Sequence, residues 1–203
     1  MSRFPRARRP VERVPRREYL LTLDQSLLSF SFYSLRKIEM LNINTIHRIE
    51  EIIEAGIIKS HNIDPENLTS LTKLKIVRRM NQMIRLCLYI ELYRRKHATN
   101  FEPLLERKAL HHAMHTLFSI EPMKAQLYQL KDIVILFHNE IKGLSLTGDA
   151  NNFIEKLDKQ VEYYNSATAT SWRNTSIEYR YMSDYYWDEF PIEETHRLLG
   201  EII

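Results

Sequence analysis

Glycine is scarce in this chain: only four occur in 203 residues, at positions 56, 143, 148 and 200. Chains built from strands need many sharp turns, and glycine most readily adopts the backbone angles of such turns. Glycine scarcity therefore disfavours all-β and α/β architectures. We expect an all-α fold: a single helical bundle of about five helices, with a basic N-terminal arm and an aromatic-acidic C-terminal tail.

The spacing of apolar residues predicts where the first two helices lie. One is expected from a cap at Asn42 or Asn44 to about Ser60, with an apolar stripe of Ile46, Ile49, Ile53 and Ile57. The next is expected from Leu68 to about His97, because the segment Asp64-Pro65-Glu66-Asn67 is typical of a capped start. Its expected apolar face consists of Leu71, Leu74, Val77, Ile84 and Cys87 or Leu88.

Three more helices are expected in the second half of the chain. Pro103 leads into one over residues 104–118, and Pro122 opens another that Gly143 ends after about Lys142. Asp149 is expected to cap the last one. Its apolar residues are Phe153, Ile154, Leu157, Val161 and Tyr164. Residues 19–41 suit either a helix or an extended segment across the bundle.

Charge divides the chain into three parts. Residues 1–18 carry a net charge of +5 and form an Arg/Pro-rich arm, residues 19–170 form the helical domain, and residues 171–203 carry −4 and form a docking tail. The arm holds seven arginines: Arg3, Arg6, Arg8, Arg9, Arg13, Arg16 and Arg17. Guanidinium groups match phosphate geometry, so the arm predicts contact with a nucleic acid. A solubilising tail or a nuclear import signal is the alternative.

The helix expected over residues 68–97 is the second cationic feature. Residues 67–97 carry a net charge of +7. We expect four of these cations to form an outward ridge for a phosphate backbone: Lys75, Arg78, Arg79 and Arg85. The alternative is a solvated face paired with acids of a neighbouring helix, such as Glu50, Glu51 and Glu54.

Aromatic and acidic residues are concentrated in the C-terminal tail, over residues 178–190. Aromatic side chains flanked by acids are typical of docking segments, so the tail predicts contact with a protein partner. The candidate partner-binding residues are Tyr185, Tyr186, Trp187, Phe190, Leu198 and Ile202. A short amphipathic helix is expected near the end of the chain. In the alternative interpretation the tail folds back on its own bundle or belongs to the core.

Few sequence patterns point to catalysis. Two histidines of the set His111, His112 and His115 have a spacing compatible with a metal ion, but the zinc-protease pattern is missing, so we expect no metal site. Glycine-rich phosphate loops and nucleophile elbows are also missing. We expect neither catalytic residues nor a cofactor, and therefore a non-enzymatic protein.

The single cysteine, Cys87, excludes an intrachain disulfide and favours a reducing compartment. We expect no membrane span, because no apolar run approaches 18 residues. The leading expectation is a nuclear adaptor of a chromosomal complex, which contacts DNA without sequence specificity and binds protein partners through its bundle and tail. A viral RNA-packaging protein and a cytoskeletal scaffold without nucleic acid are the alternatives, and self-association remains open.

Overall fold

The computed structural model describes residues 43–146, 148–169 and 181–200. These residues belong to one compact unit and form eight α-helices and one short 3-10 helix, with no strand among them. The all-α prediction is confirmed. The arginine arm, the ambiguous segment 19–41, Asn42 and Ile202 lie outside the described residues.

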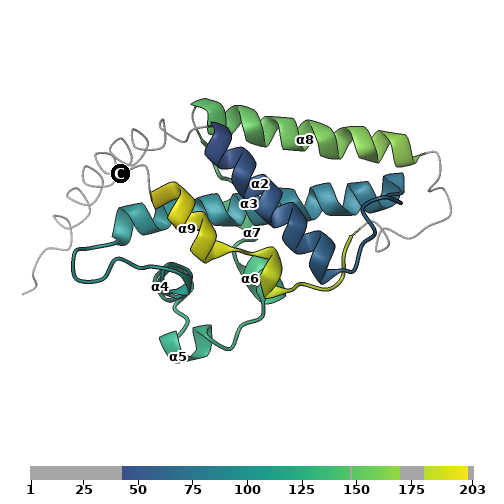
Figure 1. Cartoon of the computed structure of the whole chain (residues 1–203). Coiled ribbons are helices and arrows are strands. Elements are labelled where there is room, and N and C mark those ends of the chain that lie inside the picture. The colour runs from purple at the N-terminus through teal and green to yellow at the C-terminus, as the bar shows by residue number, and fades with distance from the viewer. Residues whose placement is uncertain (1–42, 147, 170–180, 201–203) are drawn as a thin grey trace, which may run out of the picture. The chain divides into compact units, whose positions relative to one another are not determined.

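Helix α3 (Ser70–His97) is the central element. Its 28 residues span about 42 Å at the usual rise of an α-helix. Helix α8 (Gly148–Ala169) runs beside it, and α2 (Ile43–Ser60) crosses it (Figure 1). Buried residues occur nearly all around α3, as expected of a helix enclosed by others.

The isoleucine stripe of α2 is buried as predicted. Ile46, Ile49, Ile53 and Ile57 are all at most 1% exposed. Gly56 lies on the same helix, and a Cβ placed there would be 2.4 Å from the carbonyl oxygen of Asp188. The backbone of the C-terminal segment therefore packs directly on α2, at a position that has no side chain.

The helix predicted over residues 122–142 is wrong in detail, because the chain breaks it into three. These are α5 (Pro122–Ala125), α6 (Leu130–Leu136) and α7 (His138–Lys142), which Gly143 ends as expected. A capping box of Gln129 and Asp132 restarts the helix at α6. The chain turns again at Phe137, whose fully buried ring packs edge-on against Phe118 at 5.1 Å.

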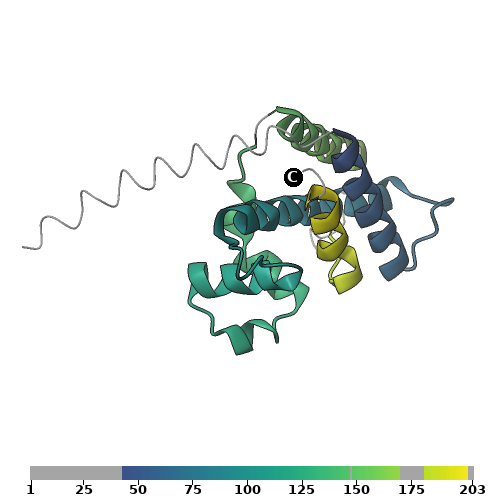
Figure 2. The same ribbon diagram turned by 60° about the vertical axis from the view of Figure 1, so that its left-hand side comes forward.

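Helix α4 (Arg107–Phe118) and α5 lie on the opposite side of α3 from α8 (Figure 2). Helix α4 begins three residues later than predicted, after a segment in which Leu104 and Glu106 have positive φ angles of 51° and 54°. These values are unusual for residues other than glycine. The backbone N–H of Glu106 donates to Nδ1 of His196, which holds this connection against the C-terminal part of the chain.

Two other helix starts differ from the prediction. Thr69, rather than the Asp64 segment, caps α3, because its hydroxyl accepts the N–H of Thr72 at 3.1 Å. Asp64 instead accepts the N–H of Glu66 in a local turn. Asn44 lies inside α2, and α8 begins at Gly148 with Asp149 in its first turn.

The described part of the tail is a 3-10 helix, η2 (Trp187–Glu189), followed by α9 (Ile192–Gly200). The expected C-terminal helix is therefore present. Both elements pack against the bundle: η2 and α9 contact α2, and α9 also contacts α3. Among the described residues, no helix is both long and apolar enough to cross a membrane.

Candidate functional site

The predicted basic ridge is wrong at Arg79, which lies in the interior. Its side chain is 2% exposed and donates to Oε2 of Glu189 at 2.6 Å. It also donates to the carbonyl oxygens of Met182 and Asp184, and lies 3.4 Å from the ring centre of Tyr185. Both terminal nitrogens of this guanidinium therefore donate inside the protein, and Arg79 is not available to an external phosphate.

Arg78 and Arg85 instead line a groove between α3, α7 and α8. The groove has a volume of about 320 Å³. Lys142 and His138 of α7 line it as well. Among the described residues that line it, cations and neutral groups are present and no acid.

Both groove arginines have partners at the wall. Arg85 donates two hydrogen bonds to Asp158 of α8, at 2.8 and 3.0 Å, and one to Asn81. Asn81 in turn donates to Asp158 at 2.7 Å. Arg78 donates to the amide oxygen of Asn165 and lies over the ring of Tyr181. These contacts fix the two guanidinium groups in place at the groove.

Three polar groups that line the groove have no partner in the described part of the chain: the side chains of Gln82, His138 and Lys142. His138 and Lys142 are exposed, and Gln82 is partly exposed. They supply an amide, an imidazole and an ammonium group to the lining of the groove. The rest of the lining includes Ile141, Val161 and the half-exposed ring of Tyr181.

The sequence pattern indicated Arg78 and Arg85 of the groove but not the lining residues from α7. His138 and Lys142 are four residues apart, which places them on one helical face, yet nothing in the sequence links that face to α3. Lys75, the fourth predicted ridge residue, is partly exposed and lies outside the groove lining. As in the alternative interpretation, Arg85 pairs with an acid of a neighbouring helix, but this acid is Asp158 of α8 and not one of the acids suggested on α2; Arg79 pairs with Glu189 of η2.

The candidate partner-binding residues that the structure describes in the tail contact the protein itself. Phe190 and Leu198 are buried in the core, which corrects the expectation that they are available to a partner. Tyr185 packs on Arg79, and Arg107 lies 3.9 Å from the ring centre of Trp187. Tyr186 keeps 44% of its surface exposed, although its ring contacts His61 edge-on. The described tail thus corresponds to the folded-back alternative.

A second buried carboxylate cluster surrounds Glu91 on α3. Arg94 and Arg95 both donate to Glu91, and Nε2 of His196 lies 3.7 Å from it. Burial lowers the pKa of His196, and the Arg94 charge adds to this effect, while Glu91 and Glu106 oppose it. This cluster joins α3 to α9 and does not border the groove.

The histidines of α4 make separate contacts. Nδ1 of His112 lies 2.8 Å from the hydroxyl of Tyr93, and Nδ1 of His115 contacts the carbonyl oxygen of Ile120. Burial lowers the pKa of His111. Within the ranges that the structure describes, no cluster of three histidine, cysteine or acidic side chains is suited to hold a metal ion.

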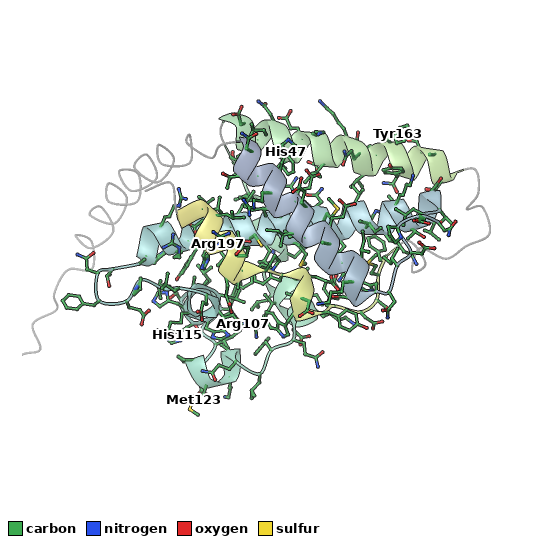
Figure 3. The ribbon with its side chains drawn as sticks, in the orientation of Figure 1. His47, Arg107, His115, Met123, Tyr163 and Arg197 are labelled. Carbon is green, nitrogen blue, oxygen red and sulfur yellow. The ribbon has the colours of Figure 1, made fainter. Side chains whose placement is uncertain are left out.

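Large apolar side chains are exposed around α5. Met123 is 83% exposed and points away from the bundle, and Leu127, four residues later, is 81% exposed (Figure 3).

No protein-family model, no curated protein and no solved structure matches this chain.

Proposed function

We propose that this protein is a non-enzymatic nuclear adaptor of a chromosomal complex, which contacts DNA phosphates through its arginine arm and its basic groove. The observation that carries the proposal is the groove itself: cations of both α3 and α7 line it, and no acid lines it among the described residues. Lysine and arginine placed near a phosphate backbone release counterions, which drives binding without sequence recognition.

Different surfaces of the protein bind DNA and protein partners. The arm and the groove residues Arg78, Arg85 and Lys142 contact phosphates. Protein partners bind the bundle, where Met123 and Leu127 are exposed. Because Phe190 and Leu198 belong to the core, the tail contributes to partner binding only through its exposed residues, such as Tyr186.

Deletion of residues 1–17 from the full-length protein tests the proposal. The deletion removes seven arginines, so DNA affinity should fall. The slope of log affinity against log salt should also become shallower, by ~0.9 for each phosphate that the arm no longer neutralises. Fluorescence polarisation with labelled DNA over a series of salt concentrations measures both. Equal affinity and equal salt slope with and without the arm would contradict its role.

Lys142→Ala tests the groove separately, since Lys142 is exposed and has no described partner. Removal of one cation from a phosphate should reduce the salt slope by about 1. Lys131→Ala is the matched control, because Lys131 is an exposed lysine of α6 outside the groove lining.

A further inference from the structure

From the composition of the groove, we infer that it binds one nucleoside phosphate unit, with the phosphate at its cations and the base on Tyr181. This inference rests on the proposed function and narrows it from phosphate contact in general to single-stranded DNA. A nucleoside phosphate combines an anion, a flat aromatic face and a hydrogen-bonding edge. The groove offers a matching group for each of the three.

The base platform is the ring of Tyr181. The guanidinium carbon of Arg78 lies 4.5 Å from the centre of this ring, which supports it from one side. The ring remains 48% exposed, and the apolar side chains of Ile141 and Val161 line the same groove. Aromatic rings in this setting stack nucleobases of any sequence. The amide of Gln82, which lacks a described partner, can donate to or accept from the edge of the base.

The phosphate site lies toward Arg85. Arg78 and Arg85 are two turns apart on α3, a separation of about 10 Å along the axis. Arg78 lies over Tyr181, so we place the base at this end of the arginine pair and the phosphate toward Arg85. Asp158 neutralises Arg85, so the ammonium of Lys142, which has no partner in the described ranges, supplies the net positive charge. One nucleotide spans this distance from its phosphate to the edge of its base.

The dimensions favour a single strand over a duplex. A volume of about 320 Å³ is at the small end of ligand pockets and suits one nucleotide. In a duplex the bases are stacked on one another, so only phosphates would reach the groove, and Tyr181, Ile141 and Val161 would contribute nothing. The apolar part of the lining therefore distinguishes the two forms of DNA.

The test compares Tyr181→Leu with Tyr163→Leu in the full-length protein. Tyr163 is an exposed tyrosine of α8 outside the groove and serves as the matched control (Figure 3). Polarisation is measured with a short labelled strand and with the duplex of the same sequence. We expect Tyr181→Leu to weaken binding of the strand by about fivefold or more and to leave duplex binding unchanged, because stacking is lost only from the strand. Tyr163→Leu should change neither.

Lys142→Ala supports the inference if it lowers the affinity for the single strand and reduces the salt dependence of that affinity. Circular dichroism should show that the fold of the variant is unchanged. If free AMP displaces the labelled strand, the groove also binds a free nucleotide. If only an unlabelled strand displaces it, the groove binds a nucleotide only when that nucleotide is part of a DNA strand. Both results support the site.

Three outcomes distinguish failure of the nucleotide site from failure of the proposed DNA-binding function. If the wild-type protein binds strand and duplex but Tyr181→Leu affects them equally or not at all, the inference is overturned and the proposed function stands. If a phosphoserine peptide displaces the strand and AMP does not, the groove takes a different ligand and the inference is overturned. If the wild-type protein binds neither DNA at low salt, the proposed function itself fails.

Discussion

Two pairs of arginines on the same helix have opposite surroundings. Arg79 and Arg94 are buried, and each is held by a buried carboxylate, Glu189 or Glu91. Arg78 and Arg85 lie on the groove side of α3, where an amide and a half-exposed carboxylate hold them. We refer to the first pair as the inner arginines and to the second as the groove arginines. The inner arginines are enclosed where the tail packs on the bundle, whereas the groove arginines shape a concave surface.

This difference shows that the charge count of a helix does not indicate which charges are available. Arg78 and Arg79 are adjacent in sequence but differ in direction by about 100° around the helix axis. One therefore faces α8 and the groove, and the other faces η2 and the tail. Burial of a guanidinium is tolerated only where a carboxylate and carbonyl oxygens satisfy it, and the C-terminal segment supplies them to Arg79.

Arg79→Met should give the largest loss of stability. It leaves Glu189, which is 0% exposed, without this cation, and breaking a buried ion pair costs about 3–5 kcal/mol. Urea denaturation followed by circular dichroism measures the loss. The double variant Arg79→Met with Glu189→Met should recover part of it, since neither charge of the pair then remains buried. Equal losses of stability in Arg79→Met and Arg85→Met would contradict the distinction between the inner and the groove arginines.

Gly56→Ala should give the next largest effect. The added Cβ would lie 2.4 Å from the carbonyl oxygen of Asp188, so η2 and with it Glu189 must move away from α2. We expect a loss of about 1–3 kcal/mol in the free energy of unfolding, although alanine itself favours a helix. Glu51→Ala, at an exposed position of α2, is the control and should change stability by less than about 0.5 kcal/mol. A stabilising Gly56→Ala would show that η2 does not pack there.

The cluster around Arg94 should make stability depend on pH. Burial lowers the folded-state pKa of His196, and also of His97 and His111. Below about pH 6.5, the ordinary pKa of histidine, the unfolded chain therefore binds more protons than the folded one. This contribution to stability is present above that pH and is lost as the pH falls toward the folded-state values.

Urea unfolding on either side of the ordinary histidine pKa, at about pH 7.5 and about pH 5.5, measures this loss. His196→Asn should reduce the difference in the free energy of unfolding between these two pH values. His97 and His111 should account for part of the difference that remains. An unchanged pH dependence in His196→Asn would show that the buried imidazole near Glu91 does not contribute.

Arg85→Gln should have the smallest effect on stability, because its partner Asp158 is 49% exposed at the side chain. We expect a loss of no more than about 1 kcal/mol. Its effect on DNA binding should be clearer: lower affinity and a salt slope reduced by about 1. A loss of stability as large as that of Arg79→Met, without a change in binding, would reverse the roles of the two pairs.

Local patterns predicted much of the fold. The isoleucines of α2, the end of α7 at Gly143 and the presence of α9 all follow from residues three or four positions apart or from single residues with strong preferences. The helix expected over residues 122–142 is broken twice: the restart at Gln129 has a local capping box that the prediction missed, whereas at the second break Phe137 packs in the core beside Phe118 of a different helix. No local pattern contains the contact between Phe137 and Phe118.

The candidate site was only half predicted. Its α3 wall was found from its charge, but Lys142, His138 and Tyr181 come from segments far along the chain. Arg79 was placed on the wrong face because its carboxylate, Glu189, is 110 residues away.

The amino-acid sequence alone determined that this protein is helical, where most of its helices run and which stripe of α2 is buried, because helical hydrogen bonds and apolar spacing link residues within one turn. Only the tertiary structure decided which arginines are enclosed and which border a groove. A guanidinium is buried only where an opposite charge is buried with it, and the carboxylate that does this for Arg79, like the half-exposed one that holds Arg85 at the groove, comes from a distant segment of the chain.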